Sequence, residues 1–178
     1  LCLGVGYAAL TDNLIVNGTV NFLKNANAEA TFAANVHFVD GSASVNYTGT
    51  TTGVSSGVST EVVDEDADPK NVDDKLNITV DNTVLAKAGD KVTISVDIIN
   101  ASTDYGAKIT LNAATSTGTN LGTLYSVTST WATGDTGTIA KGGTNTNTVE
   151  ITIELLKTPT EDVVADTFTI TYVAESVE

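Results

Sequence analysis

The chain has 178 residues and a formal net charge of −14, with 22 acidic residues against 8 basic ones, all of which are lysines. Arginine is the main reader of guanine edges and planar phosphates, and a strongly negative chain repels phosphate groups. Nucleic acids and anionic membrane surfaces are therefore excluded as partners.

Read with the period of a β-strand, the first ten residues have one bulky and one bare side. Leu1, Leu3, Val5, Tyr7 and Ala9 point one way in an extended chain, and the residues between them are cysteine, glycine or alanine. The stretch is apolar but too short to span a bilayer. A strand of this kind fits a groove at a sheet edge, so we predict that residues 1–12 are a donor strand that completes the next subunit.

The composition also predicts export. The chain contains no methionine, so we interpret it as the product of a longer precursor whose signal peptide has been cleaved. The single cysteine, Cys2, cannot form an intrachain disulfide. We favour the interpretation that Cys2 is a small apolar residue packed in a groove; the alternatives are a lipid anchor or a disulfide between chains at this residue. We expect an extracellular protein.

Residues 13–178 are predicted to form a single β-sandwich domain, because apolar residues alternate with polar ones between turn signals. No stretch has sustained helical periodicity. Two strands follow glycine turns in the same way, at Gly89 and at Gly142–Gly143. The predicted strands lie, in chain order, at 14–22, 32–38, 76–80, 92–98, 107–113, 124–131, 149–155 and 168–174.

Residues 41–59 are small and polar and predict a long loop or weak edge strands. About eight or nine strands in total predict an all-β fold, a jelly-roll or Greek-key sandwich with an extended N-terminal donor strand.

An acidic segment near 61–75 is the strongest candidate for a ligand site. Asp64, Asp66 and Asp68 alternate along it, and clusters of carboxylate oxygens can bind Ca²⁺. The glycine and closing glutamate of an EF-hand loop are absent at the required spacing. We favour a solvated charged loop that keeps the protein soluble, with a calcium site as the alternative.

Catalysis has little support. His37 is the one histidine, whereas a zinc protease of the HExxH type needs two histidines one helical turn apart. It lies between Val36 and Phe38 in a strand pattern, which predicts an outward-facing side chain. We predict that the protein is not an enzyme.

Four N-glycosylation sequons occur, each an asparagine followed two residues later by threonine or serine. The candidate acceptor residues are Asn17, Asn46, Asn77 and Asn100. Asn46 lies in the predicted loop region and is the best placed of the four.

The two ends of the chain resemble a known family. Gly6 to Asp12 and Asn17 to Val20 are similar to the start of TasA- and camelysin-like proteins, the matrix proteins cut by a SipW-type signal peptidase. Residues 88–100 and 167–172 resemble strands that recur in that family. This chain departs from the family by keeping extra apolar residues ahead of Tyr7.

The resemblance implies a jelly-roll subunit of a biofilm fibre or bundling pilus, polymerised by N-terminal strand donation. Its partners would be identical subunits in a helical homopolymer and other matrix components, in a cell-surface filament. Two alternatives stay open: a monomeric adhesion or glycan-binding module, whose exposed aromatic residues would be few, and the secreted metalloprotease activity with which camelysin-like proteins are associated.

Overall fold

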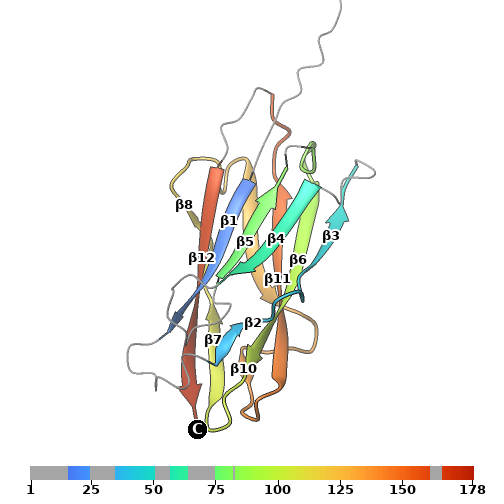
Figure 1. The fold of residues 1–178 in the computed structure, drawn as a ribbon. Coiled ribbons are helices and arrows are strands. Elements are labelled where there is room, and N and C mark those ends of the chain that lie inside the picture. Colours follow the sequence, from blue (N-terminus) through green and yellow to red (C-terminus); the bar gives the residue numbers. More distant parts are fainter. Residues whose placement is uncertain (1–15, 25–34, 51–56, 64–74, 82, 161–165) are drawn as a thin grey trace, which may run out of the picture.

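The computed structural model describes residues 16–24, 35–50, 57–63, 75–81, 83–160 and 166–178 (Figure 1). These residues form two β-sheets and contain no α-helix. Accordingly, no helix in the described ranges is long and apolar enough to cross a membrane.

The two sheets are built from twelve described strands. In chain order these are β1 Val16–Lys24, β2 Val36–Phe38, β3 Ser44–Thr48, β4 Val58–Val63, β5 Lys75–Val80, β6 Lys91–Asn100, β7 Gly106–Leu111, β8 Thr115–Ser116, β9 Tyr125–Trp131, β10 Thr138–Ile139, β11 Asn145–Leu155 and β12 Asp166–Val177. Sheet A has seven strands in the order β10-β7-β12-β1-β5-β4, with β8 also pairing β12. Sheet B has five, in the order β2-β6-β11-β9, with β3 also pairing β6.

The second half of the chain passes back and forth between the sheets. From β5 in sheet A it continues to β6 in sheet B, β7 in sheet A, β9 in sheet B, β10 in sheet A, β11 in sheet B and β12 in sheet A. The strand pairs are antiparallel except that of β1 with β12, which is parallel. The first and last described strands therefore lie side by side in the middle of sheet A (Figure 1).

The hydrophobic core lies between the two sheets because each long strand turns every second residue inward. The alternation is strict in β6, where Val92, Ile94, Val96 and Ile98 are buried and the residues between them are partly exposed. Fully burying a side chain of this size contributes roughly 1.5–3 kcal/mol. A single connected cluster of buried residues from both sheets results, and its largest aromatic members include Phe38, Phe168 and Tyr172.

The parallel contact between β1 and β12 depends on a glycine. Gly18 pairs with Phe168, and the ring of Phe168 occupies the space in which a side chain at position 18 would lie. Val16 and Val20, two residues to either side of Gly18, are fully buried. The sequence Asn-Gly-Thr-Val at the start of β1 therefore places its one residue without a side chain beneath a buried ring.

The turn before β6 is held by a buried carboxylate. Asp90 is 1% exposed, and it accepts hydrogen bonds from the backbone nitrogens of Ala86, Lys87 and Thr50 at 2.8–3.0 Å. Gly89 has a φ of 92°, a left-handed conformation that glycine adopts without strain. Burial tends to raise the pKa of Asp90, but these hydrogen bonds outweigh it and lower the pKa below its usual value.

The all-β sandwich predicted from the alternation is confirmed, but the strand count is larger than eight or nine. Four strands are additional: β8 and β10 have two residues each, β3 lies in the segment predicted to be a loop or weak edge strands, and β4 begins in that segment. Two residues cannot display a period of two. The acidic segment is also shorter than predicted, because Glu61 to Val63 belong to β4 and Lys75 begins β5.

Candidate functional site

Several residues singled out by the sequence lie outside the described residues. They are the donor-strand positions Leu1, Leu3, Val5, Tyr7 and Ala9, the cysteine Cys2, and the candidate calcium ligands Asp64, Asp66 and Asp68. In the described ranges, no three histidine, cysteine or acidic side chains are grouped so that they could hold a metal ion.

His37 has the surroundings of a structural residue. It is half-buried in β2 between the fully buried Val36 and Phe38, so its ring points away from the core as predicted. Its Nδ1 lies 2.7 Å from the carbonyl oxygen of Phe38. Among the described residues, the hydrogen-bond partner of the ring is therefore a backbone carbonyl of its own strand.

Three of the four sequon asparagines are accessible to different degrees. Asn46 is exposed on the outer side of β3, whereas Asn17 and Asn77 are half-buried on the outer side of sheet A. In that sheet Asn17 lies opposite Thr79, and Asn77 lies opposite Thr19. The two sequons of β1 and β5 are thus paired side by side, and two glycans there would compete for the same space.

Asn100 has to be removed from the candidate glycosylation sites. Its side chain is fully buried, and its Nδ2 donates to the carbonyl oxygens of Tyr105, Ile139 and Ala140 at 2.9–3.4 Å. Its Oδ1 accepts a hydrogen bond from the backbone nitrogen of Ser102 at 3.1 Å. A sequon is defined only by the residues that follow the asparagine. It does not indicate whether the side-chain amide is accessible, and the amide of Asn100 is buried.

Asparagine side chains also close the β10 edge of sheet A. Asn100 in β6 donates to carbonyl oxygens in and after β10, as described above. From β11, Asn147 donates to the carbonyl oxygens of Thr136 and Thr138, and Asn145 donates to those of Ala140 and Lys141. The backbone carbonyls that an added strand could otherwise pair with therefore already accept hydrogen bonds from side chains of sheet B.

The opposite edge of sheet A is open by comparison. Strand β4 pairs with β5 over all six of its residues, and its other side pairs with no strand in the described part of the chain. It contains no proline, lysine or bulge, and Glu61 on its outward side is its one charged residue.

The two edges of sheet B differ from each other. Strands β2 and β3 both pair with β6, but residues 39–43 between them interrupt the pairing opposite Asp97. Ser42 fills the interruption, since its hydroxyl donates to the Val39 carbonyl and accepts from the Asp97 nitrogen. At the other edge, β9 continues for seven residues without a break.

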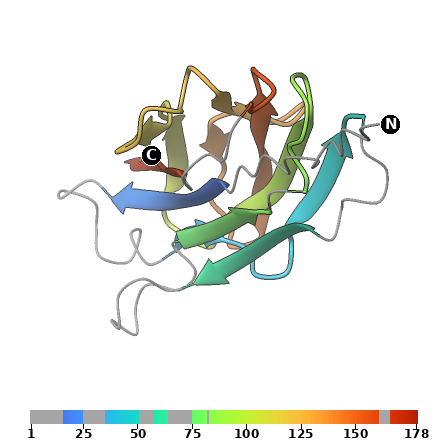
Figure 2. The ribbon, with the colours of Figure 1, turned by 90° about the horizontal axis from the view of Figure 1, so that it is seen from above.

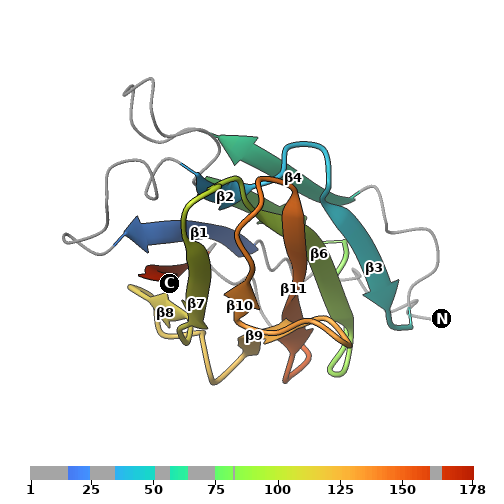
Figure 3. The ribbon, with the colours of Figure 1, turned by 90° about the horizontal axis from the view of Figure 1, so that it is seen from below.

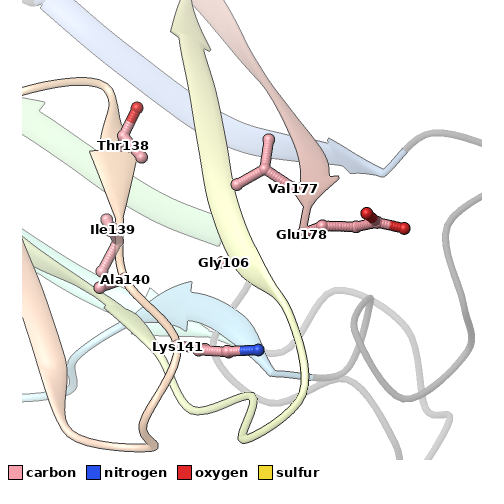
Figure 4. Close-up of a pocket in the computed structure, with 7 residues that line it drawn as sticks. All are labelled: Gly106, Thr138, Ile139, Ala140, Lys141, Val177 and Glu178. Atoms are coloured by element: carbon pink, nitrogen blue, oxygen red, sulfur yellow. The ribbon is translucent and has the colours of Figure 1, made fainter.

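A shallow apolar pocket lies at the end of sheet A where β7 begins and β12 ends (Figure 4). Its volume is about 260 Å³, and it is lined by Gly106, Thr138, Ile139, Ala140, Lys141, Val177 and Glu178. Apolar groups make up most of the lining, and Thr138, Lys141 and Glu178 are its polar members.

A buried polar cluster joins β8 to the start of β12. Asp166 is 4% exposed and accepts hydrogen bonds from Ser116 Oγ at 2.7 Å and from the Thr167 nitrogen at 2.9 Å. Burial tends to raise its pKa, but these hydrogen bonds lower it overall. Burial, reinforced by the charge of Asp166, raises the pKa of Tyr125 well above its usual range. The raised pKa means that the buried site favours the uncharged, protonated phenol.

Two comparisons with known proteins add no relatives. Neither a scan of protein-family models nor a search of curated proteins gives a match to this chain. The resemblance to TasA- and camelysin-like proteins therefore stays a prediction from the residues quoted above.

The sequence did not point to the open β4 edge. Its valines stand among glycine, serine, threonine and acidic residues, and only the pairing order reveals which strand ends the sheet. The absence of proline and lysine from Val58–Val63 was the one available signal.

Proposed function

We propose that this chain is the structural subunit of an extracellular filament, in which residues 1–10 of one subunit complete the β-sandwich of the next. In this proposal the two sheets form a jelly roll, the subunits assemble into a helical homopolymer at the cell surface, and the protein is not an enzyme. The observation that carries the proposal is the alternation of bulky and small residues from Leu1 to Ala9.

The pairing of residues 1–10 with the next subunit is expected to have a favourable free energy. Burying Leu1, Leu3, Val5 and Tyr7 would contribute roughly 1–3 kcal/mol each, and a row of backbone hydrogen bonds about 1 kcal/mol each. Association itself costs about 4–15 kcal/mol in lost freedom, which the sum of these contributions can exceed. Covalent links between subunits are not needed.

The charge of the chain suits a soluble fibre. A net charge of −14 makes the surfaces of adjacent fibres repel each other. The outer faces of both sheets carry many threonines, for example Thr93 and Thr152, whose hydroxyl oxygens lie 3.1 Å apart on sheet B. Threonine is favoured in strands, so these faces need no further ligand to explain them.

Negative-stain electron microscopy of the secreted protein tests the proposal. The full chain should form filaments, and a variant lacking residues 1–9 should remain monomeric or aggregate without order. A matched control keeps the length but replaces Leu3 and Val5 by serine, which removes two apolar side chains from the bulky side. Filaments of normal length from the deletion variant would show that these residues are not the joint.

A further inference from the structure

We infer that the donor strand of a second copy pairs with the outer edge of β4, Val58–Val63. This inference rests on the proposed function and specifies where the added strand binds. It starts from the pairing order, in which β4 ends sheet A and is uninterrupted over six residues. The occupant to which it commits is the segment Leu1–Leu10 of another subunit.

Among the described residues, the burial of inward-facing side chains decreases toward this edge. On β5 the inward-facing Leu76, Ile78 and Val80 are at most 1% exposed. Their neighbours on β4, Val58 and Val62, face the same side but are only partly buried. Burial therefore declines toward the last strand of sheet A, which is the pattern expected where a further strand would cover the core.

The facing sheet shows the same decline on the same side of the sandwich. There β3 presents Val45 and Tyr47 toward the core, and both are partly buried and pack against it. Figures 2 and 3 show β3 and β4 on one side of the molecule, away from β8. An apolar strand added beside β4 would contact side chains from both sheets.

The donor segment has the correct phase for this position. The inward side of β4 carries Val58, Thr60 and Val62, and the outward side carries Ser59 and Glu61. A paired strand keeps its bulky residues on the inward side only if its small residues point outward. The alternation of residues 1–9 meets this condition, and the segment adds no charge to the core.

The other edges accept a strand less well. The asparagine side chains described above occupy the β10 edge, and the break at residues 39–43 interrupts the β2–β3 edge. Strand β9 is continuous, but its inward-facing Ser129 accepts a hydrogen bond from the buried Tyr172 hydroxyl at 2.9 Å. An apolar strand beside β9 would meet Ser129 in this hydrogen bond, whereas beside β4 it would meet Val58 and Val62 on either side of Thr60.

The single cysteine of the chain provides the probe. Cys2 lies on the small-residue side of the donor segment, so it should face outward beside Ser59 or Glu61. We would make Ser59→Cys and Glu61→Cys separately in the full chain. The matched controls are Thr128→Cys and Thr130→Cys, which lie on the outward side of β9, and all four sites are exposed. Disulfides require Cα atoms about 4.4–6.8 Å apart, so cross-linking reports strand adjacency.

Filaments of each variant would be oxidised with oxidised glutathione and separated on a non-reducing gel. We expect at least one β4 variant to give a ladder of dimers, trimers and higher species that collapses on reduction. Each β9 variant should give about a tenth as much cross-linked product or less. Circular dichroism of every variant verifies that the substitution leaves the fold intact.

The contrary outcomes separate the two proposals. Filaments that cross-link through β9, or through neither strand, would overturn the β4 assignment while leaving the filament in place. A monomer with an internal disulfide to Ser59→Cys or Glu61→Cys would show that the chain completes itself, and it would overturn the assignment to a second copy. Loss of filaments in the unmodified protein would overturn the proposed function itself.

Discussion

Replacing Gly18 by alanine adds one methyl group where the Phe168 ring already lies. Both residues are buried, and the ring has no exposed side toward which it could turn. Overpacking of this kind costs about 1–3 kcal/mol. Replacing a glycine also reduces the conformational entropy of the unfolded chain, which stabilises the folded state by about 0.4–1 kcal/mol. We therefore expect Gly18→Ala to lower the free energy of unfolding by about 1–2 kcal/mol.

Urea unfolding followed by Trp131 fluorescence measures this effect as a lower midpoint at an unchanged slope. For a chain of this size, 1 kcal/mol corresponds to roughly 2–4 °C in Tm. Thr19→Ala, on the opposite face of β1, is the matched control and should change stability by about 0.5 kcal/mol or less. The double variant Gly18→Ala with Phe168→Leu should lose less than the sum of the single losses. An alanine variant as stable as the original would mean that the ring does not fill this space.

Two further predictions concern buried polar groups. Asn100→Ala should lower the free energy of unfolding by about 1–3 kcal/mol, because three buried carbonyls lose their donor. Asn145 is exposed, so Asn145→Ala should lower the free energy of unfolding by less than half as much. Equal losses in denaturant unfolding would contradict this prediction. For Asp90, the folded-state pKa lies below the unfolded one, so its contribution is complete above about pH 4 and is lost as the pH falls through the folded pKa. Stability measured against pH should therefore fall less steeply in acid for Asp90→Asn than for the original chain, and parallel curves would show that Asp90 is not responsible.

The strands that alternate over many residues could be predicted from the sequence. In β6 and β11 the inward-facing positions read from the pattern, such as Val96 and Ile151, are buried in the structure. The echo of glycine turns before these strands also corresponds to a structural relation, since they are neighbours in sheet B. Periodicity works here because each strand has one face toward the core.

The pairing of distant segments could not be predicted in this way. Nothing local in Val16–Lys24 indicates that it lies parallel to β12, about 150 residues later. The structural role of Asn100 could not be predicted either, because the carbonyls of Ile139 and Ala140, to which it donates, are about 40 residues away in the chain. For the candidate site, the sequence suggested the donor segment but not the strand that would receive it.

The most direct measurement of the central claim mixes the variant lacking residues 1–9 with a synthetic peptide of residues 1–12. If the peptide completes the sandwich, the unfolding free energy should rise by RT ln(1 + [L]/Kd), about 2.7 kcal/mol at a hundred times Kd. A peptide with Leu3 and Val5 replaced by serine should have a much smaller effect. An unfolding curve that the original peptide leaves unchanged at saturating concentration would contradict strand donation.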